Sequence, residues 1–206
     1  MQTRFPPVAL VLFMVTGLTP FFSTAQPVMP DYTAVTDERL LNPEARNWLS
    51  YRGTLDGWGF SRLDEIDDSN VQQLEPVWSF STGVLGGHEA PPIVNNGVMF
   101  VTTPGNLVYA IDAASGDLLW RYQHGLPETY IAFHRTNRGV ALYGDKVYTA
   151  TLDARVVALD AKTGRKEWDN TVQDNNFGYY ITMAPLAIDG KILVGTSGGE
   201  LGIRGF

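Results

Sequence analysis

The residues with the clearest chemical potential lie in the stretch TSGGELGIRGF, from Thr196 to Phe206. One carboxylate, Glu200, stands there among glycines, and a glutamate can supply two oxygen ligands to a hard cation such as calcium. Gly198 and Gly199 would allow a ligand to approach the backbone closely, because glycine has no Cβ. Taken alone, the same residues are also compatible with an ordinary hairpin loop.

Three other polar residues are candidates for the same chemistry: Glu89 in GGHEAPPIV, Arg138 in TNRG and Thr182 before MAP. A guanidinium, a hydroxyl and exposed backbone amides are the hydrogen-bond donors that an anionic ligand requires. Each residue also has a structural interpretation, since Glu89 could be a solvated turn acid and Arg138 could form an ion pair between repeated units. Taken singly, these residues do not decide between a structural role and a binding site.

The composition limits the class of protein. The chain has 206 residues, with 21 Gly, 12 Pro, 12% aromatic and 44% hydrophobic residues, which suits one compact body rich in strands and turns. A formal net charge of −7 without a basic run argues against a nucleic-acid partner. The sequence contains no cysteine, so neither disulfides nor thiolate metal sites are available.

The N-terminal residues predict export from the cytoplasm. MQTRF carries one Arg and no acid, Val8 to Phe22 carry no charge, and Ser23 to Ala25 place small residues where a signal peptidase cleaves. The alternative, a membrane anchor, requires about 20 apolar residues, and Gly17 and Pro20 interrupt this shorter run. We therefore expect a removable signal peptide over residues 1–25.

Residues 26–77 are expected to form an N-terminal arm and the first strands of the propeller. The polar part of this region contains one helical candidate, TDERLLN, with Thr36 or Asp37 as its cap. From Trp78 onward, short β-branched and aromatic runs are separated by Gly, Asn and Asp, a pattern typical of strands and hairpins.

An internal repeat indicates the fold class. AIDAASGDLLW and ALDAKTGRKEW begin 48 residues apart, at Ala110 and Ala158, and share Ala, Asp, Ala, Gly and Trp at identical offsets. The strand-like stretches GVMFV, DKVYT and GKILV repeat with steps of 48 and 45. Such periods indicate four-stranded units that stack because each cannot bury both faces alone. The chain is therefore predicted to be all-β, with residues 78–206 forming the blades of a β-propeller.

The repeat also predicts how neighbouring blades dock. An Asp followed by Ala-Ser-Gly or Lys-Thr-Gly makes a tight turn, since Gly accepts positive φ and Asp can bond nearby backbone. Trp78, Trp120 and Trp168 follow this turn or its equivalent, and each is expected to donate its indole N–H to a neighbouring carbonyl between blades. About two and a half units are visible, whereas closed propellers have four to eight, so the propeller is predicted to be incomplete.

Three long stretches are more specific than the repeat. They are NWLSYRGTLDGWGFSRLDEIDDSNVQQLEPVWSFSTG, NRGVALYGDKVYTATLDARVVALDAKTGRKEW and TMAPLAIDGKILVGTSGGELGIRG. From about Val35 to its end, the chain resembles the quinoprotein alcohol dehydrogenases, the family of methanol and ethanol dehydrogenases that depend on pyrroloquinoline quinone (PQQ). The resemblance implies a periplasmic protein and an N-terminal fragment that carries roughly the first three blades of an eight-bladed propeller.

The resemblance also assigns roles to the candidate residues. It implies that PQQ is bound by Glu89, Arg138, Thr182, Ser197, Gly198 and Gly199. Arg138 corresponds to an arginine that contacts the ortho-quinone oxygens, and Thr182 to a threonine that binds a PQQ carboxylate. Glu200 corresponds to one carboxylate ligand of the family's calcium ion, whose place a lanthanide could take.

The activity that the resemblance implies is oxidation of an alcohol to an aldehyde, with electrons passed to a cytochrome c or a quinone. The family's aspartate base and its other calcium ligands correspond to positions beyond Phe206, so no catalytic residue is expected within this chain. The missing blades would come in cis or in trans, and the chain alone is expected to be inactive.

Two other functions use related propellers. A non-catalytic periplasmic propeller of the outer-membrane assembly type, which binds protein partners, shares the Ala-to-Trp repeat but does not need Glu89, Arg138, Thr182 and Glu200. A sugar dehydrogenase with the same cofactor is disfavoured by SGGELGIRG, which resembles the alcohol-oxidising branch.

The chain departs from the family pattern at Ala132 and Phe133. Many alcohol-oxidising members have adjacent cysteines at these positions, which form a strained ring over the quinone. We expect Phe133 to pack on the face of the cofactor instead, with an effect on the range of substrates.

Overall fold

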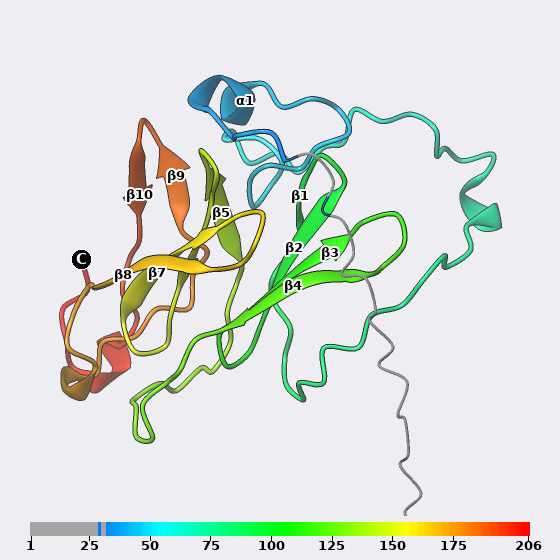
Figure 1. Ribbon diagram of the computed structural model, residues 1–206. Helices are drawn as coiled ribbons and strands as arrows, with labels where there is room; N and C mark the ends of the chain where they lie inside the picture. The colour runs from blue at the N-terminus through cyan, green and yellow to red at the C-terminus, as the bar shows by residue number, and fades with distance from the viewer. Residues whose placement is uncertain (1–28, 30–31) are drawn as a thin grey trace, which may run out of the picture.

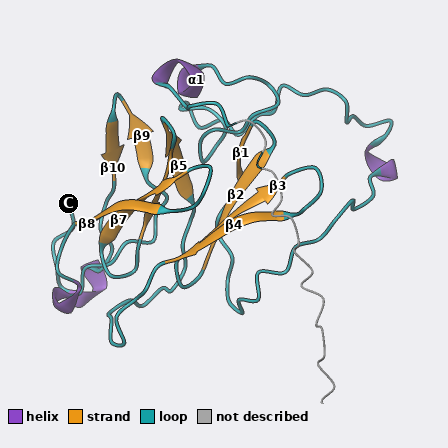
Figure 2. Ribbon diagram, viewed as in Figure 1, coloured by secondary structure: helices purple, strands orange, loops and turns teal. Residues whose placement is uncertain are grey.

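The structure is a computed structural model that describes Met29 and residues 32–206 (Figure 1). The predicted signal peptide, residues 1–25, lies outside the described residues. Within the described part of the chain, no helix is long and apolar enough to cross a membrane. Antiparallel strands and the loops between them dominate the structure (Figure 2).

The first sheet has four antiparallel strands in sequence order. They are β1 (Ile93–Asn95), β2 (Val98–Thr103), β3 (Leu107–Asp112) and β4 (Leu118–Gln123). The side chains of Val98 and Phe100 on β2 are fully buried, because alternate residues of a strand point to the same face and this face covers the core. The sheet therefore has the architecture predicted for one blade.

The second sheet repeats the first. Its strands are β5 (Val140–Tyr143), β6 (Lys146–Ala150), β7 (Arg155–Asp160) and β8 (Lys166–Thr171). A third sheet contains β9 (Leu186–Ile188) and β10 (Lys191–Leu193). The repeated stretches GVMFV, DKVYT and GKILV form β2, β6 and β10, so the predicted partial β-propeller is confirmed: two complete blades and the first strands of a third are described.

The two complete blades share an irregularity that the repeat did not predict. The pairing of β3 with β4 shifts between Ala110 and Ile111, and the pairing of β7 with β8 shifts between Ala158 and Leu159. A β-bulge of this kind increases the local twist of a strand pair. The bulge lies beside the tryptophan-bearing strand in both blades and therefore belongs to the repeat.

Two of the three tryptophans predicted to dock blades, Trp78 and Trp120, make the expected contact, and the docking role of Trp168 stays a prediction. Trp78 Nε1 donates to the Ala113 carbonyl at 3.1 Å, and Trp120 Nε1 donates to the Ala161 carbonyl at 2.9 Å. Gly164 has a φ of +69°, and a Cβ built on it would lie 2.5 Å from Cε3 of Trp120. Only glycine can accept both this backbone conformation and the indole against it.

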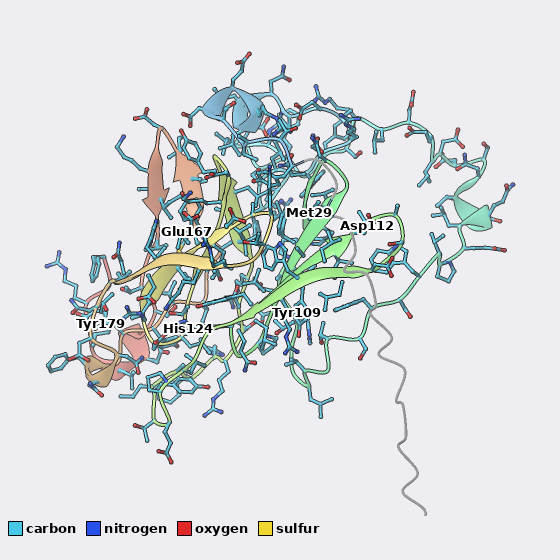
Figure 3. The ribbon with its side chains drawn as sticks, in the orientation of Figure 1. Met29, Tyr109, Asp112, His124, Glu167 and Tyr179 are labelled. Atoms are coloured by element: carbon cyan, nitrogen blue, oxygen red, sulfur yellow. The ribbon has the colours of Figure 1, made fainter. Side chains whose placement is uncertain are left out.

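The turns beside these contacts are closed by aspartates, also as predicted. Asp112 Oδ1 accepts hydrogen bonds from the backbone N–H groups of Ala114 and Ser115, and Figure 3 labels Asp112 at its turn. Asp160 Oδ1 accepts in the same way from the N–H groups of the two residues that precede Gly164 in the second blade's turn. The repeated Asp therefore fixes the loop on which the next tryptophan rests.

The N-terminal arm is attached to all three sheets. It contains the helix α1 (Asp37–Leu41), which Thr36 caps by accepting from the Arg39 N–H. Trp48 forms an isolated bridge with Val94 of β1. Asp37 accepts from the Tyr143 hydroxyl and from the Asp189 N–H, both at 2.7 Å, and so joins α1 to the second and third sheets (Figure 1). Three short 3-10 helices cover Val71–Gln73, Asn175–Phe177 and Gly199–Leu201.

Candidate functional site

Arg138 lies in the loop before β5 and contacts two of the other predicted site residues. Its backbone N–H donates to the Thr182 carbonyl at 2.9 Å, and its Nη1 donates to Thr182 Oγ1 at 2.7 Å. Its Nη2 forms an ion pair of 2.9 Å with Glu89 Oε2, in which the side chains are 38% and 48% exposed. Because a guanidinium has five N–H donors, these contacts leave donors for a ligand.

Thr182 and Ser197 lie on two segments that pair with each other. Tyr180 and Ser197 form an isolated antiparallel bridge, in which the Ser197 N–H donates to the Tyr180 carbonyl at 2.7 Å. This pairing brings Thr182 Oγ1 to 3.5 Å from Ser197 Oγ. Two hydroxyl groups therefore lie beside the guanidinium of Arg138.

Glu200 lies in the 3-10 helix Gly199–Leu201, and a buried tyrosine holds its side chain. The Tyr180 hydroxyl donates to Glu200 Oε1. Burial of Tyr180 and its hydrogen bond to Glu200 raise the pKa of the phenol to about 12, so the phenol keeps its proton at neutral pH. The same hydrogen bond holds the pKa of the Glu200 carboxyl below its usual value, and this group is a carboxylate at neutral pH.

The two predicted glycines have different surroundings. A Cβ built on Gly198, whose φ is +120°, would lie 2.1 Å from the Gly178 carbonyl oxygen, so the fold itself requires glycine there. A Cβ built on Gly199 would meet no heavy atom within 4 Å. Space for the close approach of a ligand therefore exists at Gly199, whereas Gly198 packs against the chain.

Six of the seven predicted site residues line one open cleft of about 730 Å³. Its walls are formed by Phe133, His134, Arg138, Tyr180, Thr182, Ser197, Gly198, Gly199 and Glu200. Glu89 lines a neighbouring cleft of about 460 Å³, which shares Phe133 and His134 with the first. It reaches the main cleft through its ion pair with Arg138. Phe133 is 63% exposed on the shared wall, where its ring can contact a ligand.

Tyr180 and His134 also line the cleft, although neither was predicted from the sequence. Tyr180 precedes Thr182 by two positions, and residues two apart in an extended segment point to the same face. The two-residue spacing from Thr182 could therefore have predicted that Tyr180 lines the same cleft. His134 follows Phe133 in an irregular loop, where no periodicity predicts the direction of a side chain.

A metal site is only partly represented in the described residues. They contain no group of three or more His, Cys, Asp or Glu side chains that could hold a metal ion. Calcium takes six to eight oxygen ligands, so Glu200 could contribute to such a site but could not form it alone.

A family model supplies the assignment. The model for PQQ proteins described as the glucose/ethanol/alcohol dehydrogenase β-propeller domain matches residues 48–199. The chain belongs to this PQQ propeller family. The match begins in the arm at Trp48, includes both complete blades and ends at Gly199 in the cleft.

Individual relatives agree with this assignment. The chain is 40% identical to quinohemoprotein alcohol dehydrogenase ADH IIB of Pseudomonas putida, over 97% of this chain and 29% of the relative. It is 37% identical to methanol dehydrogenase [cytochrome c] subunit 1 of Paracoccus denitrificans, over 81% and 28%. The solved structure of a europium-containing methanol dehydrogenase matches with a TM-score of 0.77 and 37% identity, over 82% and 31%. The chain thus spans less than a third of the length of these relatives.

The cleft of this PQQ propeller chain fits one side of the family's cofactor. PQQ is flat and carries three carboxylates, which require cationic and hydroxyl donors. The adjacent hydroxyls of Thr182 and Ser197 would supply such donors to a carboxylate, and the partly exposed guanidinium of Arg138 would supply cationic donors to the quinone oxygens. The open space above Gly199 allows a flat ring to approach the backbone.

Proposed function

We propose that the chain provides the N-terminal part of the cofactor site of a PQQ-dependent dehydrogenase that oxidises alcohols to aldehydes. The observation that carries the proposal is the convergence of Arg138, Thr182, Ser197 and Glu200 on one cleft in a chain of the PQQ propeller family. The electron acceptor in this proposal is a cytochrome c or a quinone. A relative whose name includes cytochrome c supports the first of these acceptors.

Each residue has a distinct role in this proposal. When bound, PQQ supplies the two-electron acceptor for the alcohol. Arg138 stabilises negative charge on the quinone oxygens, an electrostatic contribution that is strongest in a site shielded from water. Thr182 and Ser197 donate to a carboxylate of the cofactor. Glu200 contributes one carboxylate to a calcium ion or to a lanthanide, and the europium in a related methanol dehydrogenase supports the wider choice of ion.

The proposal requires further blades, in cis or in trans, which supply the aspartate base and the other metal ligands. Apolar side chains on the third sheet support this requirement: Leu186, Ile188 and Leu193 are 41%, 39% and 48% exposed. A sheet that leaves such residues and its edge uncovered is a template for further strands. The reading frame beyond codon 206 tests this part, because additional Ala-to-Trp repeats are expected there or in a separate partner chain.

We also propose that the mature protein is periplasmic, on the basis of the predicted signal peptide over residues 1–25. Fractionation of the source cells, with N-terminal sequencing of the secreted form, tests it. A mature N-terminus near Gln26 is expected, and retention of the intact chain in the cytoplasm would contradict the proposal.

Substitution of Arg138 by alanine tests the function. The protein is assembled with the blades that complete its propeller, and two quantities are measured: dye-linked alcohol oxidation and PQQ content. Because Arg138 is proposed to act mainly on developing charge, turnover is expected to fall about 100-fold or more, while most of the PQQ is retained. Arg121→Ala, which removes an exposed arginine of β4, is the matched control and is expected to change neither quantity.

Two outcomes would overturn parts of this assignment. Equal losses of turnover and PQQ content in Arg138→Ala would make the arginine a binding residue instead of an electrostatic one. A completed wild-type protein that binds no PQQ and oxidises no alcohol would exclude the dehydrogenase function and favour a propeller that binds protein partners.

A further inference from the structure

Tyr180 is the one side chain in the cleft that is both fully buried and bonded to a charged group of the site. It is 1% exposed, and its hydroxyl donates to Glu200 Oε1. We propose that Tyr180 is a positioning residue that orients the Glu200 carboxylate toward a bound cation. The inference rests on the proposed function, because it assumes that Glu200 is a metal ligand.

The backbone N–H groups of Glu200 and Gly198 also interact with the carboxylate, but the hydrogen bond from Tyr180 is the largest of these interactions. Glu200 is exposed and lies in a 3-10 helix of three residues, Gly199–Leu201. Glycines with positive φ, Gly198 at +120° and Gly202 at +77°, flank the helix. Glutamate has several freely rotating side-chain bonds, so a carboxylate in this setting samples many positions unless a contact selects one.

Tyr180 can select that position because its own side chain is fixed. Its backbone pairs with Ser197 in both directions, with hydrogen bonds of 3.4 Å and 2.7 Å. The next residue, Ile181, donates its N–H to the Thr151 carbonyl of the second blade at 3.2 Å. The ring is enclosed, so the phenolic oxygen lies at a defined point on the wall of the cleft.

The hydrogen bond from Tyr180 leaves the Glu200 carboxylate able to bind a metal ion. A carboxylate has two oxygens with about four lone-pair sites, and the contact from Tyr180 uses one of them on Oε1. Acceptor sites on the carboxylate therefore remain for a cation. Hydrogen bonds of this kind orient ligands in protein metal sites, and their loss typically weakens metal binding 10–100-fold.

The experiment is a double-mutant cycle read out by calcium affinity, not by activity. Apo protein assembled with its completing blades is titrated with Ca²⁺ in a calorimeter, using wild type, Tyr180→Phe, Glu200→Gln and the double variant. Tyr180→Phe keeps the ring and removes the hydroxyl, so it is expected to raise the Kd about 10-fold. Glu200→Gln is expected to raise it further, and the double variant should bind no more weakly than Glu200→Gln alone.

The chain offers a matched control in the adjacent tyrosine. The Tyr179 hydroxyl donates to the Arg204 carbonyl at 3.3 Å and does not line the cleft (Figure 3). Tyr179→Phe is expected to leave the calcium Kd unchanged.

The outcomes separate this inference from the proposed function. If Glu200→Gln weakens calcium binding and Tyr180→Phe does not, the positioning role is wrong and the proposed function stands. If Glu200→Gln leaves the Kd unchanged, the metal role of Glu200 in the proposed function is wrong. If the losses in the double variant add, Tyr180 acts through the fold and not through Glu200, and the inference is wrong.

Discussion

The docking contacts between blades differ from the cleft in one respect. The polar groups of the docking contacts have hydrogen-bond partners within the protein, whereas those of the cleft are only partly paired. The indole of Trp120 is 8% exposed, its N–H has a carbonyl partner at 2.9 Å, and Gly164 packs directly on its ring. In the cleft, Arg138 is 38% exposed in its ion pair with Glu89 and retains unused donors. The docking contact can therefore be explained by the fold alone, whereas the cleft keeps polar capacity that a ligand could use.

The difference also concerns repetition. The Trp120 contact has a counterpart in Trp78, whose indole N–H reaches Ala113 and whose ring occupies the space beside Gly116. Scaffold contacts recur because every blade must dock on the next. The hydrogen bond from Tyr180 to Glu200 joins two loops of the third repeat and does not follow the Ala-to-Trp pattern. Repeated residues thus indicate the scaffold, and the proposed site residues lie in the loops that interrupt it.

Removing the docking indole tests the scaffold side of this comparison and has the largest expected effect. Trp120→Ala should lower the free energy of unfolding by about 3–5 kcal/mol, because it leaves a cavity between blades and an unpaired carbonyl at Ala161. Urea denaturation followed by circular dichroism measures the change. Trp58→Ala is the control, since Trp58 is 78% exposed, and a similar loss in both variants would contradict the scaffold role.

A buried hydrogen bond between His124 and Asp153 is expected to have an intermediate effect. His124 Nε2 lies 3.0 Å from Asp153 Oδ2, with 7% and 9% of the side chains exposed, and Thr151 Oγ1 donates to the other carboxylate oxygen at 2.6 Å (Figure 3). Burial disfavours ionisation of Asp153, but the hydrogen bonds from His124 and Thr151 outweigh it and hold the pKa of this carboxyl below its usual value. Asp153→Asn is expected to cost about 1.5–3 kcal/mol at pH 7, because it weakens hydrogen bonds to a charged group.

The pH dependence of this variant follows from the lowered pKa of Asp153. A carboxyl whose pKa is lower in the folded state contributes stability above its unfolded pKa of about 4, and this stability is lost as the pH falls through the folded pKa. As the pH falls below about 4, the wild type should therefore lose more free energy of unfolding than Asp153→Asn does. Asp189→Asn is the control, since Asp189 is 85% exposed in its ion pair with Lys191. Parallel pH profiles for wild type and Asp153→Asn would refute the assignment.

The smallest effect on stability is expected in the cleft. Glu89→Gln removes a half-exposed ion pair with Arg138, and such pairs contribute about 0–1 kcal/mol. The urea midpoint should hardly move. A loss above about 2 kcal/mol would show that the pair is part of the scaffold, and the contrast between docking contacts and cleft would then be wrong.

Local patterns predicted most of the architecture. The two Ala-to-Trp repeats predicted the turns closed by aspartate and the docking of Trp120. The repeated stretches GVMFV, DKVYT and GKILV predicted the positions of β2, β6 and β10. Thr36 and Asp37 were both predicted as possible helix caps, and Thr36 is the cap. These features depend on residues close together in sequence or on a contact that recurs with the repeat, so a single chain contains enough information to infer them.

Contacts between non-repeated loops were not predictable in the same way. The need for glycine at position 198 comes from the carbonyl of Gly178, and the register shift at Ala110 comes from the packing of β3 against β4. Glu89 was grouped with the other site residues, yet it lines a separate cleft and joins them only through Arg138. No spacing in the sequence encodes these distances.

The sequence by itself determined the class of fold, the family and the chemical types of the site residues, because hydrophobic period, turn chemistry and motif order are properties of the chain. Only the tertiary structure decided which of those residues meet. The Tyr180 hydroxyl reaches Glu200 because two extended segments pair at Ser197, and this pairing depends on the packing of the third repeat against the second. The direction of a side chain at such a junction is set by backbone geometry and burial, which arise only when the blades assemble.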